Sequence, residues 1–312
     1  MHVEHFARHG WVLIERLVAD ADIAAALPGL FSLYPTPEAF HAGGDPRAAR
    51  FRAGADEPAN QGEDPRFRPL QFAGLREFPF ADLALNRLAL HPAIVATAKD
   101  LLGQPDVRLY QAETFAKYTG VTQYDQPFHA DYTNHVMLPP RTDGRDRQIQ
   151  LFLFLSDVTE AHGPTRVVSK TLTADVPVMR LSFPRAQVPD ERHAAWEAAA
   201  TSATGPRGSL LVYAADVVHR GTAMTLAGGG RFFFNLAYRT AGADWVGGNP
   251  WPRKGIEPGW APLVESLAPA QLAALGFPPP GHSYWDEVTL AGAAERYPRL
   301  DLEPFRAALK GT

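Results

Sequence analysis

The sequence predicts an all-β core with helical additions, folded as a double-stranded β-helix, or jelly roll. Segments rich in β-branched and aromatic residues between positions 105 and 240 have the pattern of strands: "VRLYQAETFAKYT", "QIQLFLFLSDV", "PTRVVSKT", "SLLVYAADVVHRG" and "RFFFNLAYRT". Turn-forming residues separate them and few helices intervene, which is typical of antiparallel sheets that close on themselves. The 312 residues, of which 46% are hydrophobic, are enough for one large core.

Helical and irregular segments precede this core, over residues 1–104. The segment "VEHFARHG" predicts a short helix that ends at Gly10, and "WVLIERLV" predicts a strand. The segment "DADIAAALPGLF" predicts a helix broken at Pro28. Residues 34–70 are rich in Pro, Gly, Asp and Arg without a clear period, and predict either a long ordered excursion or a mobile loop. Helical spacing returns in "FADLALNRLAL" and "PAIVATAKDLLG", the second of which ends at Gly103.

One insertion interrupts the core from 105 to 240, and a C-terminal segment follows it. The insertion, residues 172–207, contains the predicted helix "PDERHAAWEAAATSA", and we expect it to act as a lid over the substrate entrance. Residues 241–312 are rich in Pro, Gly and Trp and predict loops with two short helices, "LAGAAERY" and "LEPFRAAL". Because no repeat or low-complexity linker divides the chain, we expect a single domain over residues 1–312.

The composition excludes several classes of protein and site. The chain has no cysteine, so any metal must be held by carboxylates and by some of its 11 histidines. The net charge is -4 and Lys and Arg are scattered, so we expect neither a nucleic-acid partner nor a membrane surface. No apolar run approaches the roughly 20 residues of a membrane span, and the N-terminus lacks a signal-peptide core. We therefore expect a cytoplasmic protein.

Four side chains suggest a metal site. In "PFHADYTNH", His129 and Asp131 are two positions apart on an extended segment, so they share one face. His219 ends a distant apolar strand, and Arg231 begins the next strand twelve residues later. In an antiparallel pair these two positions come close together. Two histidines and one carboxylate form the facial triad of non-heme Fe(II) oxygenases, and an arginine fork binds a carboxylate.

Other interpretations of the same residues remain open. His129 and Asp131 alone are compatible with ordinary surface polarity. His129, Asp131 and His135 can also form a compact local zinc site, although that arrangement leaves His219 and Arg231 without a role.

The sequence resembles the phytanoyl-CoA dioxygenase (PhyH-like) family of Fe(II)/2-oxoglutarate-dependent oxygenases. The resemblance lies in "FHAD", "LFLFLSDVTEAHGPTRVVS", "GSLLVYAADVVHRG" and "GGGRFFFNLAYR", and the opening "VEHFARHGWVLIERLV" is also similar. It implies that His129, Asp131 and His219 bind Fe(II). It also implies that 2-oxoglutarate is held at its distal carboxylate by Arg231, with help from Gln111, Thr222 and Phe152.

The same resemblance implies the chemistry. 2-Oxoglutarate and O2 would be consumed, succinate and CO2 released, and an unactivated C–H bond of a small organic substrate hydroxylated or otherwise oxidised. Asp131 favours hydroxylation, because halogenating relatives carry a small residue at that position. Residues expected to face the substrate are Tyr132, Asn134, His135 and, from the insertion, Trp196.

Two other functions compete with this hypothesis. A cupin-like zinc enzyme would use the same jelly roll and similar ligands without oxygen. A non-catalytic small-molecule binding protein would keep the fold but would catalyse no reaction. The chain shows no Arg and Lys cluster for the phosphates of a CoA thioester. Its apolar C-terminal tail is suited to pack across a homodimer.

Overall fold

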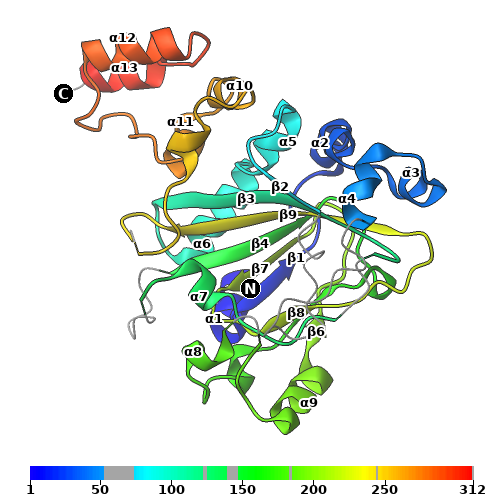
Figure 1. Cartoon of the computed structure of the whole chain (residues 1–312). Coiled ribbons are helices and arrows are strands. Elements are labelled where there is room, and N and C mark those ends of the chain that lie inside the picture. The colour runs from blue at the N-terminus through cyan, green and yellow to red at the C-terminus, as the bar shows by residue number, and fades with distance from the viewer. Residues whose placement is uncertain (53–73, 122–124, 139–146, 183–184, 244, 311–312) are drawn as a thin grey trace.

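The protein is built around two antiparallel sheets that form the predicted jelly roll (Figure 1). The computed structural model describes residues 1–52, 74–121, 125–138, 147–182, 185–243 and 245–310.

The larger sheet has six strands in the order β1-β7-β4-β9-β3-β2. Its two longest strands, β3 and β9, pair along most of their length, with a register shift between Leu109 and Gln111. Their neighbours pair just as regularly, so every side chain on this sheet is assigned to one of two faces. The strands are β1 (Trp11–Ile14), β2 (Leu75–Glu77), β3 (Val107–Tyr118), β4 (Gln148–Phe154), β7 (Leu210–Ala214) and β9 (Gly230–Thr240).

The smaller sheet has the strand order β6-β5-β8 and lies opposite the first. Its strands are β5 (Thr165–Val167), β6 (Thr201–Ser202) and β8 (His219–Gly221). An isolated bridge between His129 and His219 adds the "FHAD" segment to the free edge of β8. This edge therefore joins two segments that are far apart in the sequence.

The larger sheet has an outer and an inner face. Its outer face carries Leu151, Leu153 and Leu236, which pack with helices α2, α5 and α6 in one continuous core. Its inner face carries Phe154, Phe233 and other aromatic and polar side chains that point toward the smaller sheet. The helices before the core are α1 (His2–His9), α2 (Asp20–Leu33), α3 (Pro37–Ala42), α4 (Ala49–Arg52), α5 (Leu83–Leu88) and α6 (Pro92–Leu102).

Two expectations for the N-terminal part are corrected. The helix α2 does not break at Pro28 but continues to Leu33. Proline removes one hydrogen bond there, while Ile23 and Leu30 stay buried on either side and hold the helix against the core. Residues 34–70 are not simply a loop, because α3 and α4 lie within them, whereas residues 53–73 lie outside the described part of the chain.

Of the remaining helices, α7 lies within the core, α8 and α9 lie in the insertion, and α10 to α13 lie in the C-terminal segment. Helix α7 follows Asp131 directly, and α10 to α13 form a separate layer beside the edge of the larger sheet (Figure 1). Among the described residues, no helix is both long and apolar enough to cross a bilayer. These helices are α7 (Tyr132–His135), α8 (Val178–Leu181), α9 (Asp190–Ala199), α10 (Trp260–Val264), α11 (Pro269–Ala274), α12 (Glu287–Arg296) and α13 (Glu303–Lys310).

Candidate metal centre

Backbone pairing holds the two histidines side by side. The N–H of His129 donates to the carbonyl of His219 over 3.0 Å, and the N–H of His219 donates back over 2.8 Å. Residues paired in this way in an antiparallel ladder point to the same face. Their ring centroids are accordingly 4.6 Å apart, and both side chains are almost fully buried.

Each imidazole is fixed through its Nδ1 atom. His129 Nδ1 lies 2.8 Å from the carbonyl oxygen of Pro127, and His219 Nδ1 lies 3.1 Å from that of Val217. A carbonyl accepts only, so each Nδ1 carries the hydrogen and each Nε2 keeps a lone pair. Second contacts of this kind orient histidine ligands in metal sites.

Asp131 completes a set of three donors. Its Oδ1 lies 3.7 Å from His129 Nε2, and its Oδ2 lies 3.4 Å from His219 Nε2. One ligand atom from each of the three residues lies within 4.8 Å of the others. Two nitrogen lone pairs facing a carboxylate form an electron-rich pocket, which a divalent cation would stabilise. The donor set therefore fits Fe(II) and related ions.

The ionisation states suit metal binding. Burial, followed by the electrostatic effect of the neighbouring His219, lowers the pKa of His129 to about 4, so this ring is neutral at pH 7. Burial alone would raise the pKa of Asp131, but the nearby histidines and a hydrogen bond from Tyr213 hold it below its ordinary value. A neutral imidazole and an ionised carboxylate are the forms that bind a metal.

The inserted segment is hydrogen-bonded to the strand that carries the ligands. The N–H of Ala130 donates to the carbonyl of Leu181 over 2.7 Å, and the N–H of Ala186 donates to that of Phe128 over 2.8 Å. Trp196 is 1% exposed and packs in a cluster with Phe128 and Ala130, on the face opposite His129. Trp196 therefore anchors the insertion and is not brought to the triad.

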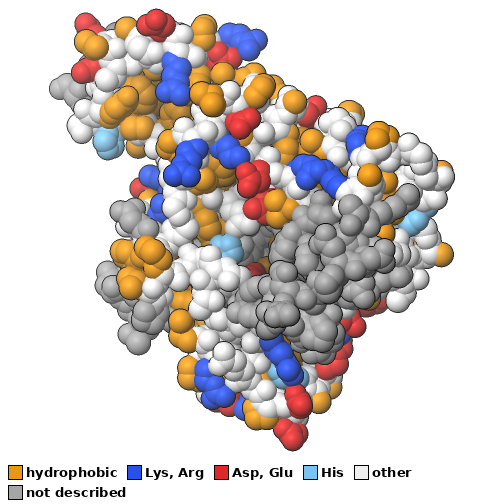
Figure 2. All heavy atoms as spheres, viewed as in Figure 1, with side chains coloured by type: hydrophobic (Ala, Val, Ile, Leu, Met, Phe, Trp, Pro, Cys, Tyr) orange, Lys and Arg blue, Asp and Glu red, His pale blue; other side chains and the backbone are white. Residues whose placement is uncertain are grey.

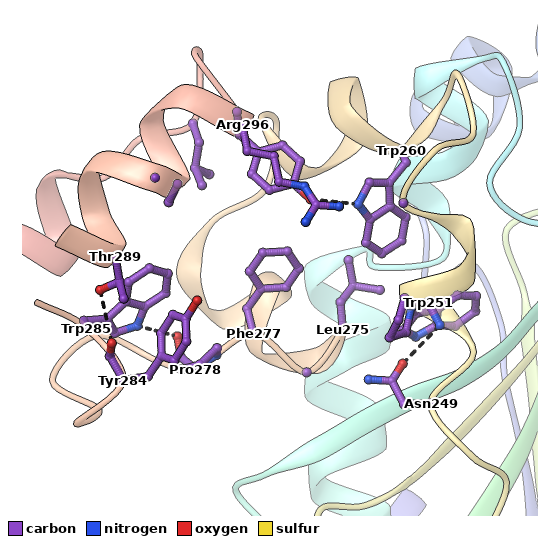
Figure 3. A pocket seen from close by; sticks show the side chains of 17 residues that line it. Asn249, Trp251, Trp260, Leu275, Phe277, Pro278, Tyr284, Trp285, Thr289 and Arg296 are labelled. Carbon is purple, nitrogen blue, oxygen red and sulfur yellow. Dashed lines mark hydrogen bonds between the residues drawn. The ribbon is translucent and has the colours of Figure 1, made fainter.

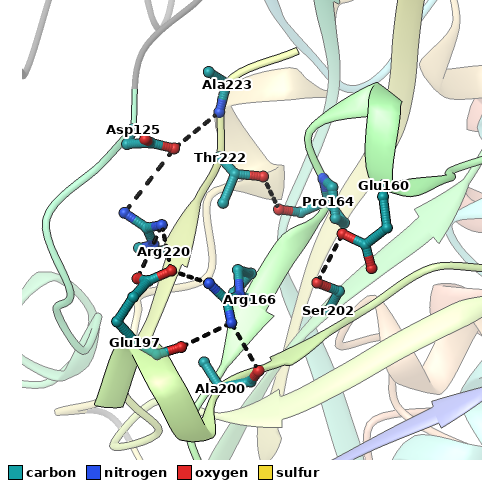
Figure 4. Close-up of polar contacts among 10 residues, drawn as sticks. All are labelled: Asp125, Glu160, Pro164, Arg166, Glu197, Ala200, Ser202, Arg220, Thr222 and Ala223. Atoms are coloured by element: carbon teal, nitrogen blue, oxygen red, sulfur yellow. Dashed lines mark hydrogen bonds and ion pairs between the residues drawn. The ribbon is translucent and has the colours of Figure 1, made fainter. Parts of the chain in front are cut away.

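Glu197 on α9 ties the insertion to the smaller sheet (Figure 4). Arg166 and Arg220 are paired across β5 and β8, and both contact the Glu197 carboxylate, Arg220 Nη2 at 2.9 Å. Arg166 also donates to the carbonyls of Glu197 and Ala200 at the end of α9. The carboxylate thus lies between two guanidinium groups, one on β5 and one on β8 directly after His219.

Replacing Glu197 by alanine is expected to lower the free energy of unfolding by about 1–2 kcal/mol, since two partly buried arginines would face each other. It should also speed proteolytic cleavage within residues 172–207. Urea unfolding and timed digestion measure the two effects, and Glu191→Ala on the same helix is the matched control. Equal behaviour of the two variants would contradict this anchoring role.

The other predicted co-substrate residues face the space between the two sheets, termed the chamber, or lie at its border. Arg231 is 3% exposed and projects from the inner face of β9 over the ring of Phe233, at 4.5 Å. Phe152 stacks on the same ring, with centroids 5.4 Å apart. Gln111 is paired with Ala237 and shares this face of the sheet. The Thr222 hydroxyl donates to the carbonyl of Pro164.

The residues after Asp131 form the wall next to the triad. His135 Nδ1 lies 3.2 Å from the Tyr110 hydroxyl, and burial lowers the pKa of His135. Tyr132 is buried, and its hydroxyl donates to a backbone carbonyl, whereas Asn134 is exposed. Within the described part of the chain, the grouping of possible metal ligands contains His219 and not His135. The distributed arrangement is therefore favoured over the local zinc site.

Tyr213 is a site residue that the sequence did not reveal. Its hydroxyl lies 3.4 Å from Asp131 Oδ2 and 3.5 Å from His219 Nε2. Burial raises the pKa of Tyr213 well above its ordinary value, so the hydroxyl keeps its proton. In "SLLVYAAD" the tyrosine has the pattern of an ordinary core aromatic. Only the register of β7 against β4 places it on the inner face beside the triad.

A cavity of about 540 Å³ lies elsewhere, in the C-terminal layer (Figure 3). Several aromatic side chains line it, among them Trp251, Trp260 and Trp285. It shares no residue with the triad. The candidate centre is therefore defined by its donor atoms and not by this cavity.

A jelly roll that gathers two histidines and an aspartate in this way defines the class of non-heme metal enzymes. Residues 6–228 match the family model described as phytanoyl-CoA dioxygenase (PhyH), and the chain belongs to this family. It is a non-heme Fe(II)/2-oxoglutarate-dependent dioxygenase that uses O2 and acts on a small organic molecule. The family predicted from the sequence is confirmed.

The chain is similar to several solved structures at low sequence identity. The non-heme monooxygenase ThoJ is 21% identical, with 77% of each chain covered and a TM-score of 0.50. The α-ketoglutarate-dependent epimerase SnoN from nogalamycin biosynthesis is 16% identical, with 77% of this chain and 81% of that chain covered and a TM-score of 0.47. HygX from Streptomyces hygroscopicus, with nickel and 2-oxoglutarate bound, is 13% identical, with 77% and 86% covered and a TM-score of 0.48. Comparison with curated proteins gave no match.

Proposed function

We propose that His129, Asp131 and His219 are the iron ligands and that Arg231 binds the distal carboxylate of 2-oxoglutarate. We propose further that the enzyme hydroxylates an unactivated C–H bond of its substrate. The observation that carries the proposal is the convergence of three donor atoms within 4.8 Å, from segments almost a hundred residues apart. The retained aspartate supports hydroxylation, since it fills the ligand position with a carboxylate.

The protein's own contribution is positioning. Bound Fe(II), with 2-oxoglutarate and O2, supplies the oxidation of the C–H bond and the release of succinate and CO2. The backbone pair between His129 and His219 fixes the spacing of the two imidazoles, and their Nδ1 contacts fix the ring orientation. Phe152 and Phe233 line the inner sheet face and exclude water from the chamber.

We propose a substrate wall made of Tyr132, Asn134 and His135, because these residues follow Asp131 directly on α7. Of the three, His135 has the most support as a substrate contact, because its Nδ1 lies within hydrogen-bond distance of the Tyr110 hydroxyl and the charge of Asp131 acts on its pKa. We propose Gln111, Thr222 and Phe152 as further contacts of the co-substrate. Trp196 is left out of the substrate set because its side chain packs on the opposite face.

The reaction is tested by following co-substrate turnover. Protein reconstituted anaerobically with Fe(II) is mixed with 2-oxoglutarate, O2 is admitted, and succinate is measured. Succinate should form slowly without the substrate and faster in the presence of a small molecule that fits. A cupin-like zinc enzyme would instead work without O2 or 2-oxoglutarate. Absence of both 2-oxoglutarate binding and succinate would contradict the proposal.

Metal binding should stabilise the folded protein. At a concentration of Mn²⁺ or Ni²⁺ about 100 times the dissociation constant, binding adds about 2.7 kcal/mol to the free energy of unfolding. For a chain of this size the melting temperature should rise by about 4 °C. Differential scanning fluorimetry measures the rise, with Mg²⁺ as the comparison ion. Loss of the rise in Asp131→Ala would assign it to the triad.

We also propose that residues 1–312 act as one cytoplasmic catalytic unit that forms a homodimer. Figure 2 shows hydrophobic side chains gathered over the C-terminal helices α12 and α13, which supports an interface at that end. Light scattering of the purified protein measures its mass. A mass of 34.1 kDa, that of one chain, would contradict the dimer.

A further inference from the structure

A buried lysine lies next to the proposed carboxylate-binding arginine. Lys117 is on β3, directly opposite Arg231 on β9 in the antiparallel register. Paired residues project from the same face, and here that is the inner face toward the smaller sheet. Lys117 is 2% exposed and Arg231 is 3% exposed. Two basic side chains therefore enter the space between the two sheets side by side.

Aromatic rings underlie both cations. Lys117 Nζ lies 5.9 Å from the ring centroid of Phe115, and Arg231 Cζ lies 4.5 Å from that of Phe233. Phe115 and Phe233 are themselves paired, one step further along the same two strands. Cations over aromatic faces are held in place at a modest gain in free energy. The four side chains thus form one platform that presents two basic groups.

The adjacent like charges make this platform suited to an anion. Burial, and then the charge of Arg231, lower the pKa of Lys117 well below its ordinary value. A carboxylate bound between the two side chains would interact favourably with both and would favour the charged lysine. Such a contact pairs two cations with one ligand and forms charge-assisted hydrogen bonds.

The platform faces the strand that carries His219. A Cβ atom built on Gly221 would lie 3.4 Å from Lys117 Nζ and 2.6 Å from Gln126 Oε1. Gly221 is two residues beyond His219 on β8, which is about 6.6 Å along a strand. The absence of a side chain at Gly221 leaves room for the lysine head between the sheets. Lys117 Nζ therefore lies beside Gly221, two residues along β8 from His219 of the triad.

We propose that Lys117 is a second cationic ligand of the co-substrate's distal carboxylate and that it selects a 2-oxo acid with a second carboxylate. This inference rests on the proposed function of the triad and of Arg231. With two basic groups, the site should bind a 2-oxo acid that ends in a methyl group more weakly than 2-oxoglutarate, and this extends the proposed function to the choice of co-substrate. In "AETFAKYTG" the lysine has the pattern of an exposed residue near a strand end, and only the β3 to β9 register reveals its position.

The test compares two ligands on matched variants. Calorimetry without O2, with Mn²⁺ bound, gives the affinity of wild type, Lys117→Met, Lys117→Gln and Lys117→Arg for 2-oxoglutarate and for 2-oxopentanoate. The second ligand has the same 2-oxo acid end but a methyl group in place of the distal carboxylate. Lys117→Met and Lys117→Gln should bind 2-oxoglutarate about 10- to 100-fold more weakly and 2-oxopentanoate unchanged. Lys117→Arg should recover part of the affinity.

The controls separate this inference from the proposed function. Lys99→Met, on the partly exposed α6, should bind both ligands as wild type does. Wild-type affinity for 2-oxoglutarate in both Lys117→Met and Lys117→Gln, or equal weakening of both ligands, would overturn the role of Lys117 alone. Failure of the wild type to bind 2-oxoglutarate would overturn the proposed function instead. If the variants do not fold, the ¹⁵N signal of Lys117 in the wild type should shift with 2-oxoglutarate and not with 2-oxopentanoate, and an unchanged signal would overturn the inference.

Discussion

Replacing Asp131 by alanine is expected to abolish turnover of 2-oxoglutarate and to weaken metal binding by more than about 100-fold. Asp131 supplies the single anionic donor, and without it two neutral imidazoles remain to hold a divalent ion. Loss of an outer contact of a metal ligand already costs about 10- to 100-fold in affinity, so loss of a ligand should cost more. Calorimetric titration with Mn²⁺ and a succinate assay measure the two effects.

Asp131→Ala should still fold, so its loss of turnover and of metal binding would not be caused by unfolding. The pKa of Asp131 lies below its ordinary value, so its favourable interactions outweigh its burial, and the metal-free variant should melt somewhat lower than the metal-free wild type while still unfolding in one cooperative transition. Asp106→Ala, an exposed position before β3, is the matched control and should behave as wild type. Metal affinity in Asp131→Ala within a few-fold of wild type would show that the ion binds elsewhere.

Replacing Arg231 by methionine is expected to weaken 2-oxoglutarate binding by about 100-fold and to leave metal affinity nearly unchanged. A bidentate charge-assisted contact would be lost, and two decades in affinity correspond to about 2.7 kcal/mol. The metal donors lie on other segments and keep their backbone pairing. In steady-state assays the effect should fall on the KM for 2-oxoglutarate more than on the KM for the substrate.

Arg239→Met is the matched control for this prediction. Arg239 is also buried on the inner face of β9, but it donates to the carbonyls of Thr240 and Ala243 at the opposite end of the strand. Its replacement should reduce stability without changing the affinity for 2-oxoglutarate. If the two variants bind 2-oxoglutarate equally well, Arg231 does not hold the co-substrate.

The parts of the site that were predictable from the sequence are those in which short motifs carry the chemistry. His129 and Asp131 are two positions apart, and His219 and Arg231 flank one turn between two apolar strands. Alternation within a strand and pairing of consecutive strands are local rules, so they placed these residues without knowledge of the whole fold. The jelly roll itself followed from the same strand pattern.

Features that depend on long-range register could not be predicted. Tyr213 and Lys117 reach the chamber because β7 pairs with β4 and β3 pairs with β9 in one particular alignment. A shift of one residue would turn either side chain to the other face, and a single sequence does not specify the alignment. The role of Trp196 likewise depended on tertiary packing, because the insertion is hydrogen-bonded to the strand that carries the ligands.

The donor geometry leads us to expect that His129, Asp131 and His219 hold one ion beside a dicarboxylate that reaches Arg231. A crystal grown without O2, with Mn²⁺ and 2-oxoglutarate, would locate the ion through anomalous diffraction at the manganese. We expect one strong anomalous peak bounded by the two Nε2 atoms and the Asp131 carboxylate, with 2-oxoglutarate extending from it to the Arg231 guanidinium. A peak on another set of ligands, or a 2-oxoglutarate molecule that does not touch Arg231, would contradict it.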